Sequence, residues 1–208
     1  GYMLTEIKKA AVSGILISIG GCVLLSCTKA GFIWAGALLF SLGLFAICEY
    51  GFNLYTGKVG YIADDFKNWR YILKVLLILV INLITTFIVG ILVSLCLPDI
   101  AEAARASYAA KLAAEPPKWA LSSVLCGLLM YLAVDLWKRG RRIGVFLCVP
   151  TFIFCGFDHS IANSFFNGAA IGAQTFSGRN ILFIIIVILG NAAGGMLLPL
   201  LKEKRKAE

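Results

Sequence analysis

The chain has 208 residues, of which 60% are hydrophobic and 14% charged, and its mean hydropathy is +0.90. Soluble domains are usually about 45–50% apolar and about 25% charged, so this composition excludes an ordinary water-soluble domain, whose surface would carry large apolar patches. The net charge of +8 does not indicate a nucleic-acid partner, because the basic residues fall in short segments between apolar runs, where membrane topology explains them.

Six apolar runs follow one another along the chain, each close to the roughly 20 residues that a helix needs to cross a bilayer. Before the fourth run, residues 101–114 are rich in alanine with scattered charge, which predicts a helical approach to that run. The sequence therefore predicts an all-α integral membrane protein, a single transmembrane domain over residues 1–208 with six transmembrane helices in a lipid bilayer. The runs cover residues 10–28, 32–54, 71–97, 120–137, 143–170 and 181–201.

The positions of lysine and arginine predict the orientation of the chain. Cytoplasmic loops carry an excess of these residues, and a cytoplasmic N-terminus places fourteen of them inside and five outside. We therefore expect a multi-pass protein of the inner (cytoplasmic) membrane with both termini in the cytoplasm. The five outside are Lys29, Arg105, Lys111, Lys118 and Arg179. The fourteen inside are Lys8, Lys9, Lys58, Lys67, Arg70, Lys74, Lys138, Arg139, Arg141, Arg142, Lys202, Lys204, Arg205 and Lys206.

The seven cysteines do not predict a metal site or a disulfide framework. None forms a CxxC pair or a cluster with histidine, and most lie inside apolar runs. Free cysteines in such surroundings are typically small hydrophobic fillers. We expect no metal and no cofactor.

The six spans divide into two halves of three, about residues 8–98 and 110–202. An odd number of spans in each half gives the halves opposite orientations, as in inverted-repeat transporters. The middle run of each half contains polar residues and glycine, at residues 51–57 and 156–163. Irregular backbone at membrane depth is tolerated where it is buried in protein or lines a cavity, so the two interruptions predict one site between the halves.

His159, the only histidine, lies within the fifth run beside the polar residues Asp158, Ser160 and Asn163. Ionisable residues in the bilayer core are usually functional, so we expect His159 and Asn163 to contact substrate. The alternative is a neutral histidine packed in the core. Asp158 has its own alternative, which is to cap the N-terminus of a half-helix.

Two further polar side chains are candidates for the same site. Thr56, in the first interruption, is a candidate hydroxyl group facing His159. Lys111 precedes the fourth run, where its charge would raise the local concentration of anions in a vestibule, although a solvated lysine is the more ordinary interpretation. Glu49 must face protein or water and has no predicted role.

Four segments occur in a characteristic order: Phe40-Ser41-Leu42-Gly43-Leu44, then Leu54-Tyr55-Thr56-Gly57, then GFDHSIAN at residues 156–163, then Gly190-Asn191 followed by Gly194-Gly195. Together they resemble the formate/nitrite transporter family over nearly the whole chain, and GFDHSIAN is the most specific of them.

The resemblance implies an aquaporin-like inverted-repeat fold with interrupted second and fifth helices, and a homopentamer with a pore in each protomer. It implies transport of small monovalent anions of weak acids, such as formate, nitrite, hydrosulfide, acetate or lactate, and no enzymatic activity. Carried over by position, His159 is the central pore histidine, Thr56 the threonine facing it, and Lys111 the vestibule lysine.

The resemblance also implies hydrophobic constrictions at Leu54, Tyr55 and Phe152. The chain departs from the family's usual pattern at three positions. Gly127 stands where the fourth helix often has Asn, Tyr55 where the aromatic residue is usually Phe, and Asn53 where the residue is usually acidic. These changes alter the cytoplasmic constriction, Gly127 included, and they leave the substrate unspecified.

A bare anion loses its hydration in a dry apolar constriction, whereas a neutral acid loses much less. We therefore expect Lys111 to attract the anion and the site around His159 to supply or relay a proton, since the unperturbed pKa of histidine, about 6.5, lies near working pH. Three alternatives stay open. One is a hydrosulfide or neutral small-solute channel with the same fold. Another is an intramembrane enzyme, which the lack of a nucleophile–base motif argues against. The third is a non-transporting scaffold, in which the buried polar interruptions would have no explanation.

Overall fold

The computed structural model describes residues 1–202, and all the regular elements in that part of the chain are helices. Three of the basic residues assigned to the cytoplasmic side, Lys204, Arg205 and Lys206, lie outside the described residues. The helices are α1 (Tyr2–Lys29), α2 (Ile33–Glu49), α3 (Tyr55–Lys58), the 3-10 helix η1 (Val59–Asp64), α4 (Trp69–Cys96), α5 (Pro98–Ala113), α6 (Pro116–Lys138), α7 (Ile143–Phe154), α8 (Ser160–Ala169) and α9 (Gly178–Leu201).

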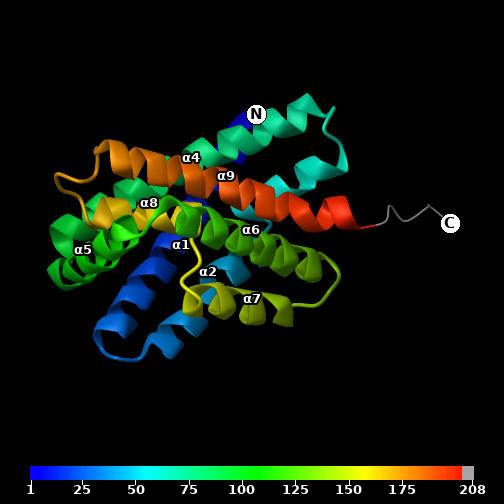
Figure 1. The fold of residues 1–208 in the computed structure, drawn as a ribbon. Coiled ribbons are helices and arrows are strands. Elements are labelled where there is room, and N and C mark those ends of the chain that lie inside the picture. Colours follow the sequence, from blue (N-terminus) through cyan, green and yellow to red (C-terminus); the bar gives the residue numbers. More distant parts are fainter. Residues whose placement is uncertain (203–208) are drawn as a thin grey trace.

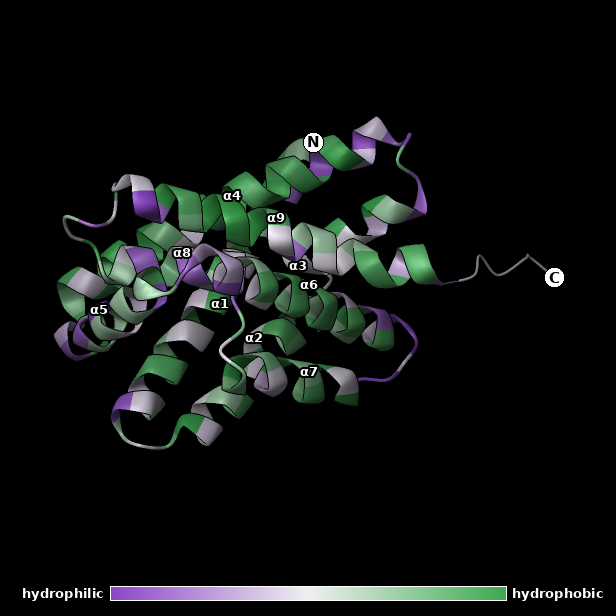
Figure 2. Cartoon of the chain, in the orientation of Figure 1, coloured by the Kyte–Doolittle hydropathy of each residue, from purple (hydrophilic) through white to green (hydrophobic). Residues whose placement is uncertain are grey.

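Four helices, α1, α4, α6 and α9, are long and apolar enough to cross a membrane. They coincide with the first, third, fourth and sixth predicted runs. Their apolar residues extend to the outer surface of the bundle, as the half-exposed Ile84, Ile88 and Leu92 of α4 illustrate. Figure 2 shows hydrophobic residues along the middle of the helices and hydrophilic residues gathered toward the connections. This distribution is that of a membrane protein, whose outer surface contacts lipid.

The connections gather at two opposite ends of the bundle. Figure 1 shows α5, the α1–α2 turn and the α8–α9 connection at one end. The η1–α4 connection, the α6–α7 loop and the end of α9 lie at the other end. We call these the α5 side and the C-terminal side. The predicted helical segment 101–114 corresponds to α5, which precedes α6 without being continuous with it.

The fifth apolar run contains two shorter helices, α7 and α8, and the second run contains α2 and is followed at once by α3; five non-helical residues join the helices of each pair. At the first junction Gly51, with φ of 65°, ends α2; at the second Gly156, with φ of 67°, ends α7. In both, the amide of the following phenylalanine donates to a carbonyl five residues back, Phe52 to Ile47 and Phe157 to Phe152, each at 2.9 Å. This is the Schellman helix end, in which glycine adopts the left-handed conformation without steric strain.

The two non-helical stretches are shorter than the sequence suggested. Residues 51–57 and 156–163 were expected to be irregular. In the structure residues 55–58 are helical, and helix α8 begins at Ser160. The reason is a pair of asparagines on neighbouring helices. Asn82 of α4 accepts a hydrogen bond from the Tyr55 amide at 2.9 Å, and Asn191 of α9 accepts one from the Ser160 amide at 2.8 Å.

Each asparagine also donates through its amide nitrogen to the non-helical stretch and to a third helix. Asn82 donates to the Asn53 carbonyl at 3.1 Å and to that of Ala10 at 2.7 Å. Asn191 donates to the carbonyls of Asp158 and Ser123, both at 2.8 Å. Both side chains are fully buried. Each asparagine thus satisfies the backbone groups on both sides of a helix start, which allows the second helix of each pair to begin immediately.

We expect Asn191→Ala to lower the free energy of unfolding by on the order of 2–4 kcal/mol, because it removes the partner of the buried Ser160 amide and of the Asp158 carbonyl. Equilibrium unfolding in detergent measures the effect. Thr151→Ala is the matched control, because its hydroxyl is exposed and bonds only within its own helix. Equal stability of the two variants would contradict the assigned role of Asn191.

Candidate functional site

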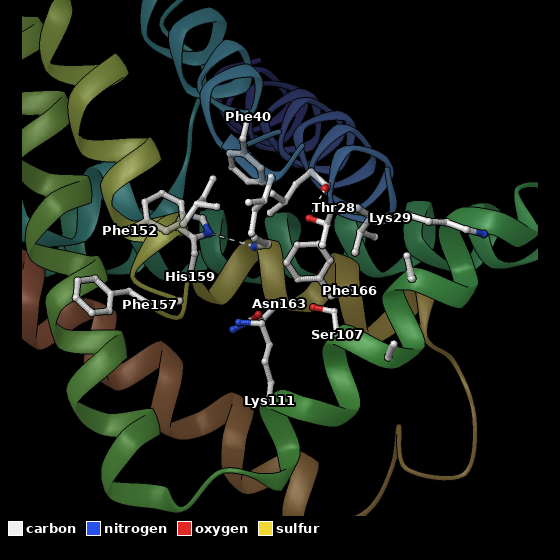
Figure 3. A pocket seen from close by; sticks show the side chains of 18 of the residues that line it. Thr28, Lys29, Phe40, Ser107, Lys111, Phe152, Phe157, His159, Asn163 and Phe166 are labelled. Atoms are coloured by element: carbon white, nitrogen blue, oxygen red, sulfur yellow. Dashed lines mark hydrogen bonds between the residues drawn. The ribbon is translucent and has the colours of Figure 1, made fainter. Parts of the chain in front are cut away.

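A cavity of about 610 Å³ opens at the α5 side and reaches His159. Its lining is mainly apolar, and Figure 3 shows Lys111 extending from α5 toward Asn163, with His159 beside Phe152. We call it the α5-side cavity. It is lined by Leu24, Leu25, Thr28, Lys29, Ile33, Phe40, Glu102, Ala103, Ala106, Ser107, Lys111, Phe152, Ile153, Gly156, Phe157, His159, Ala162, Asn163 and Phe166.

A smaller cavity of about 120 Å³ lies toward the C-terminal side. We call it the C-terminal-side cavity. Its lining shares no residue with that of the α5-side cavity, so the two are separate. It is lined by Leu44, Ile47, Cys48, Gly51, Phe52, Leu54, Gly57, Lys58, Val134, Trp137 and Lys138.

His159 sits at the start of α8 and is 2% exposed. Its Nδ1 accepts a hydrogen bond from the Ala162 amide at 3.1 Å, which caps the helix. Because a backbone amide only donates, Nδ1 carries no proton, and the hydrogen of the neutral ring is on Nε2. Nε2 lies 2.8 Å from the Thr56 hydroxyl and donates to it. The structure thus joins the two interruptions through this one hydrogen bond, while the roles of both residues in transport stay predictions.

Asp158 does not cap α8, contrary to the alternative drawn from sequence, because the His159 side chain occupies that position. Three side chains bind the Asp158 carboxylate. Lys111 Nζ and Asn163 Nδ2 lie 2.6 and 3.1 Å from Oδ1. The Ser122 hydroxyl donates to Oδ2 at 2.6 Å. Both carboxylate oxygens are therefore hydrogen-bonded.

Lys111 lines the α5-side cavity, as the resemblance implied, but its ammonium group forms an ion pair. Its side chain is 22% exposed and that of Asp158 is 7% exposed. The pair is neutral as a whole, so an anion in the cavity meets a cation that is already partly compensated. Asn163, another predicted site residue, binds the same carboxylate and faces the same cavity.

The expected constriction residues do not line the same cavity. Leu54 is 1% exposed and closes the C-terminal-side cavity, whereas Phe152 is 3% exposed and belongs to the α5-side cavity. Phe152 stacks on His159 with ring centroids 5.7 Å apart and meets Phe40 edge-on at 6.1 Å. Tyr55 lines neither cavity, because its hydroxyl donates to the Ile188 carbonyl of α9.

Gly127 also lines neither cavity, because it lies on the face of α6 that packs against α9. A Cβ atom at this position would collide with the backbone of Asn191. The glycine therefore permits close packing of the helix that carries Asn191 and does not shape a constriction directly. An asparagine at position 127 would require these two helices to separate.

Sequence reasoning missed several residues of this region. Phe40 was quoted as part of a motif without a role, and Ser122 was not singled out. Asn82 had a detectable signal, since it is a lone amide in an apolar run. Glu49 has a partner in the structure, Arg142, at 3.3 Å. Within residues 1–202 no group of three or more His, Cys, Asp or Glu side chains is arranged to hold a metal ion.

Residues 3–202 match the sequence model of the family described as formate/nitrite transporter. The chain belongs to the formate/nitrite transporter family. The matching family and the similar solved structures described below are transporters and channels, not enzymes. A relative from Bacillus subtilis (strain 168), the uncharacterized transporter YrhG, is 31% identical over 176 residues, which cover 77% of this chain. The chain spans 66% of the length of YrhG.

Two solved structures have a similar fold. An FNT family ion channel matches with a TM-score of 0.81 and 19% identity, over 94% of this chain and 87% of that one. A pentameric formate channel with formate bound matches with a TM-score of 0.74 and 22% identity, over 94% of both chains. At these identities the likeness shows the shared fold.

The Lys111–Asp158 ion pair is testable by a double-mutant cycle. We expect Lys111→Met and Asp158→Asn each to destabilise the protein, because each removes one partner of the ion pair and leaves the other charge poorly solvated. In the double variant neither charge is left, so the two single effects should differ from additivity by a coupling energy on the order of 1–3 kcal/mol. Equilibrium unfolding in detergent measures the cycle. Additivity within about 0.5 kcal/mol would show that the pair contributes nothing to stability.

Proposed function

We propose that this formate/nitrite transporter family member carries small monovalent anions of weak acids, such as formate, nitrite or hydrosulfide, across the inner membrane together with protons. The observation that carries the proposal is the polar junction of two helix pairs, which lies between two apolar cavities and presents Lys111, Asn163 and His159 to one of them. Each protomer has its own pore, and both termini are cytoplasmic.

The proposed architecture has six membrane crossings in an aquaporin-like inverted repeat. The helices α1, α4, α6 and α9 cross singly, while α2 with α3 and α7 with α8 form the interrupted second and fifth crossings. The matching roles of Asn82 and Asn191 support this repeat, because each holds the start of the second helix in its pair. A homopentamer follows by likeness to the pentameric formate channel.

Lys111 receives the anion in the α5-side cavity. An incoming carboxylate or nitrite oxygen competes with Asp158 Oδ1 for the ammonium group, while Ser122 keeps its bond to the other oxygen, Oδ2. The competition makes binding weak and reversible, which suits a pore that must release its substrate. Asn163 is placed to donate to the anion as Asp158 is displaced from it.

The apolar layer between the cavities sets the need for a proton. Phe40 and Phe152 face one cavity, and Leu44 and Leu54 face the other. A bare anion has no hydrogen-bond partner among these side chains, whereas the neutral acid loses far less solvation. The proton reaches the anion from water in the α5-side cavity, and the neutral acid passes the layer.

His159 acts in this scheme as a neutral hydrogen-bond donor. A proton on Nδ1 would break the bond that caps α8, so the resting ring is neutral. Its Nε2–H group is directed at the Thr56 hydroxyl, which leaves the hydroxyl hydrogen of Thr56 free to bind a substrate oxygen. The two residues therefore guide the acid from one cavity to the other.

Flux into liposomes that contain the purified protein tests the proposal. Formate, nitrite, lactate and hydrosulfide are compared across an imposed pH gradient, with empty liposomes as the control. We expect uptake to rise as the external pH falls, because more of the anion is then protonated at the entrance. Flux of hydrosulfide alone would favour the neutral-solute channel, and no flux of any of the four would contradict the proposal.

We expect His159→Asn to fold normally and to lower uptake at acid external pH, because the neutral acid loses the His159–Thr56 pair that guides it past the apolar layer. An asparagine side-chain oxygen can still accept the cap bond from the Ala162 amide, but the shorter side chain has no donor at the position of Nε2. Uptake as a function of external pH is the measurement, and thermal unfolding confirms that the variant is folded. An unchanged pH profile would count against a role for His159 in proton-linked transport.

Two substitutions at Thr56 separate hydroxyl chemistry from packing. Thr56→Ser keeps the hydroxyl and should retain most of the flux, whereas Thr56→Val keeps the shape and should lower it by about tenfold or more, because His159 Nε2–H is then buried without an acceptor. Initial rates of formate uptake compare the two. Equal rates for the serine and valine variants would exclude the hydroxyl from the pathway.

A further inference from the structure

The C-terminal-side cavity contains two lysines in an otherwise largely apolar lining. Lys58 is half-buried at the end of α3, directly after the Leu54–Gly57 segment that forms part of the wall. Lys138, at the end of α6, lines the same cavity and is exposed on its other side. Both lysine side chains thus line one small concave space next to Leu54.

The carboxylates on this side of the protein that form ion pairs all bind other cations. Asp64, the last residue of η1, and Asp65, which follows it, are exposed and form no ion pair with a described residue. The ion pairs on this side are Glu6 with Lys74 at 2.8 Å, Glu49 with Arg142 at 3.3 Å, and Asp135 with Arg139 at 2.9 Å and Lys202 at 2.7 Å.

Lys58 and Lys138 consequently have no carboxylate within ion-pair distance among residues 1–202. The Lys138 ammonium group lies over the ring of Tyr61, 3.4 Å from its centroid, so its nearest partner is a neutral side chain. A partly desolvated cation is stabilised by an anionic partner. The two lysines act on one space, so their fields add at the point that an anion would occupy.

We propose that Lys58 and Lys138 form a second binding site, in the C-terminal-side cavity, for a small monovalent anion. The site rests on the proposed function, since it would serve as the inner mouth of the same pore. The cavity of about 120 Å³ has room for an anion of three or four heavy atoms and one or two waters, since a water occupies about 30 Å³ in the liquid.

The two mouths then differ in charge. On the α5 side the cation Lys111 is compensated by Asp158 at 2.6 Å, whereas Lys58 has no such partner in the described chain. An anion that arrives at the C-terminal side need not displace an internal carboxylate. Substrate presented to this side therefore saturates transport at a lower concentration than substrate presented to the α5 side.

Trp137 lines the same cavity and provides a direct measure of anion binding. Iodide is an anionic quencher of tryptophan fluorescence, and acrylamide is a neutral one. The Trp137 contribution is obtained in detergent as the difference between the protein and its Trp137→Phe variant. We expect iodide quenching of Trp137 to fall by about half or more in Lys58→Met, because loss of one charge lowers the local anion concentration, and acrylamide quenching to stay unchanged.

Three controls make the result specific. Lys58→Arg keeps the charge and should retain iodide quenching, and Lys138→Met should reduce it as Lys58→Met does. Lys67→Met removes the same charge from an exposed position outside the cavity and should leave it unchanged. Formate added to the unmodified protein should reduce iodide quenching of Trp137. Equal iodide quenching in Lys58→Met and the unmodified protein, or no competition by formate, would overturn the proposal.

Failure of this site and failure of the proposed function give different results. Quenching reports binding without transport, so a lysine-dependent signal in a protein that shows no flux retains the site and rejects the pore. Flux in liposomes combined with lysine-independent quenching retains the pore and rejects the site.

Discussion

Backbone groups that lose their helical partners inside a bilayer find no water to replace them, and the architecture of this protein follows from how it meets that constraint. The junction between α2 and α3 and the junction between α7 and α8 are each bonded by a buried asparagine from a neighbouring helix, Asn82 or Asn191. These two side chains allow Tyr55 and Ser160 to start new helices. The two asparagines also bind the carbonyls of Asn53 and Asp158, so the backbone of the polar site is hydrogen-bonded to the helices around it.

The site combines charge with apolar surface in a way that a soluble protein rarely needs. The Lys111–Asp158 pair offers a cation to an anion without leaving an isolated charge near lipid. His159 is held neutral because its Nδ1 is used as a helix cap. The aromatic pair Phe40 and Phe152 then borders the apolar layer. Charged and apolar side chains thereby lie a short distance apart, which is the arrangement that the proposed transport of a weak acid requires.

The predictive value of the sequence differed among the residues of the site. His159 and Thr56 were expected to face each other, and the structure places them 2.8 Å apart. Tyr55 was expected at a constriction and instead bonds to α9. Asp158 was considered as a helix cap, a role that His159 holds. The side chains of consecutive residues in an extended stretch point in different directions, so the identity of residues 53–56 or 157–160 does not reveal which of them reaches a cavity.

The sequence by itself determined that the chain is a membrane protein, where its long apolar helices lie and which family it belongs to, because hydropathy over about 20 residues and the GFDHSIAN segment are local properties. Only the tertiary structure decided which polar groups meet. The partner of Lys111 lies 47 residues away along the chain, and that of Thr56 lies 103 residues away. The isolation of Lys58 likewise depends on where every nearby carboxylate lies. Such pairings are set by the packing of whole helices, and a short stretch of sequence does not determine that packing.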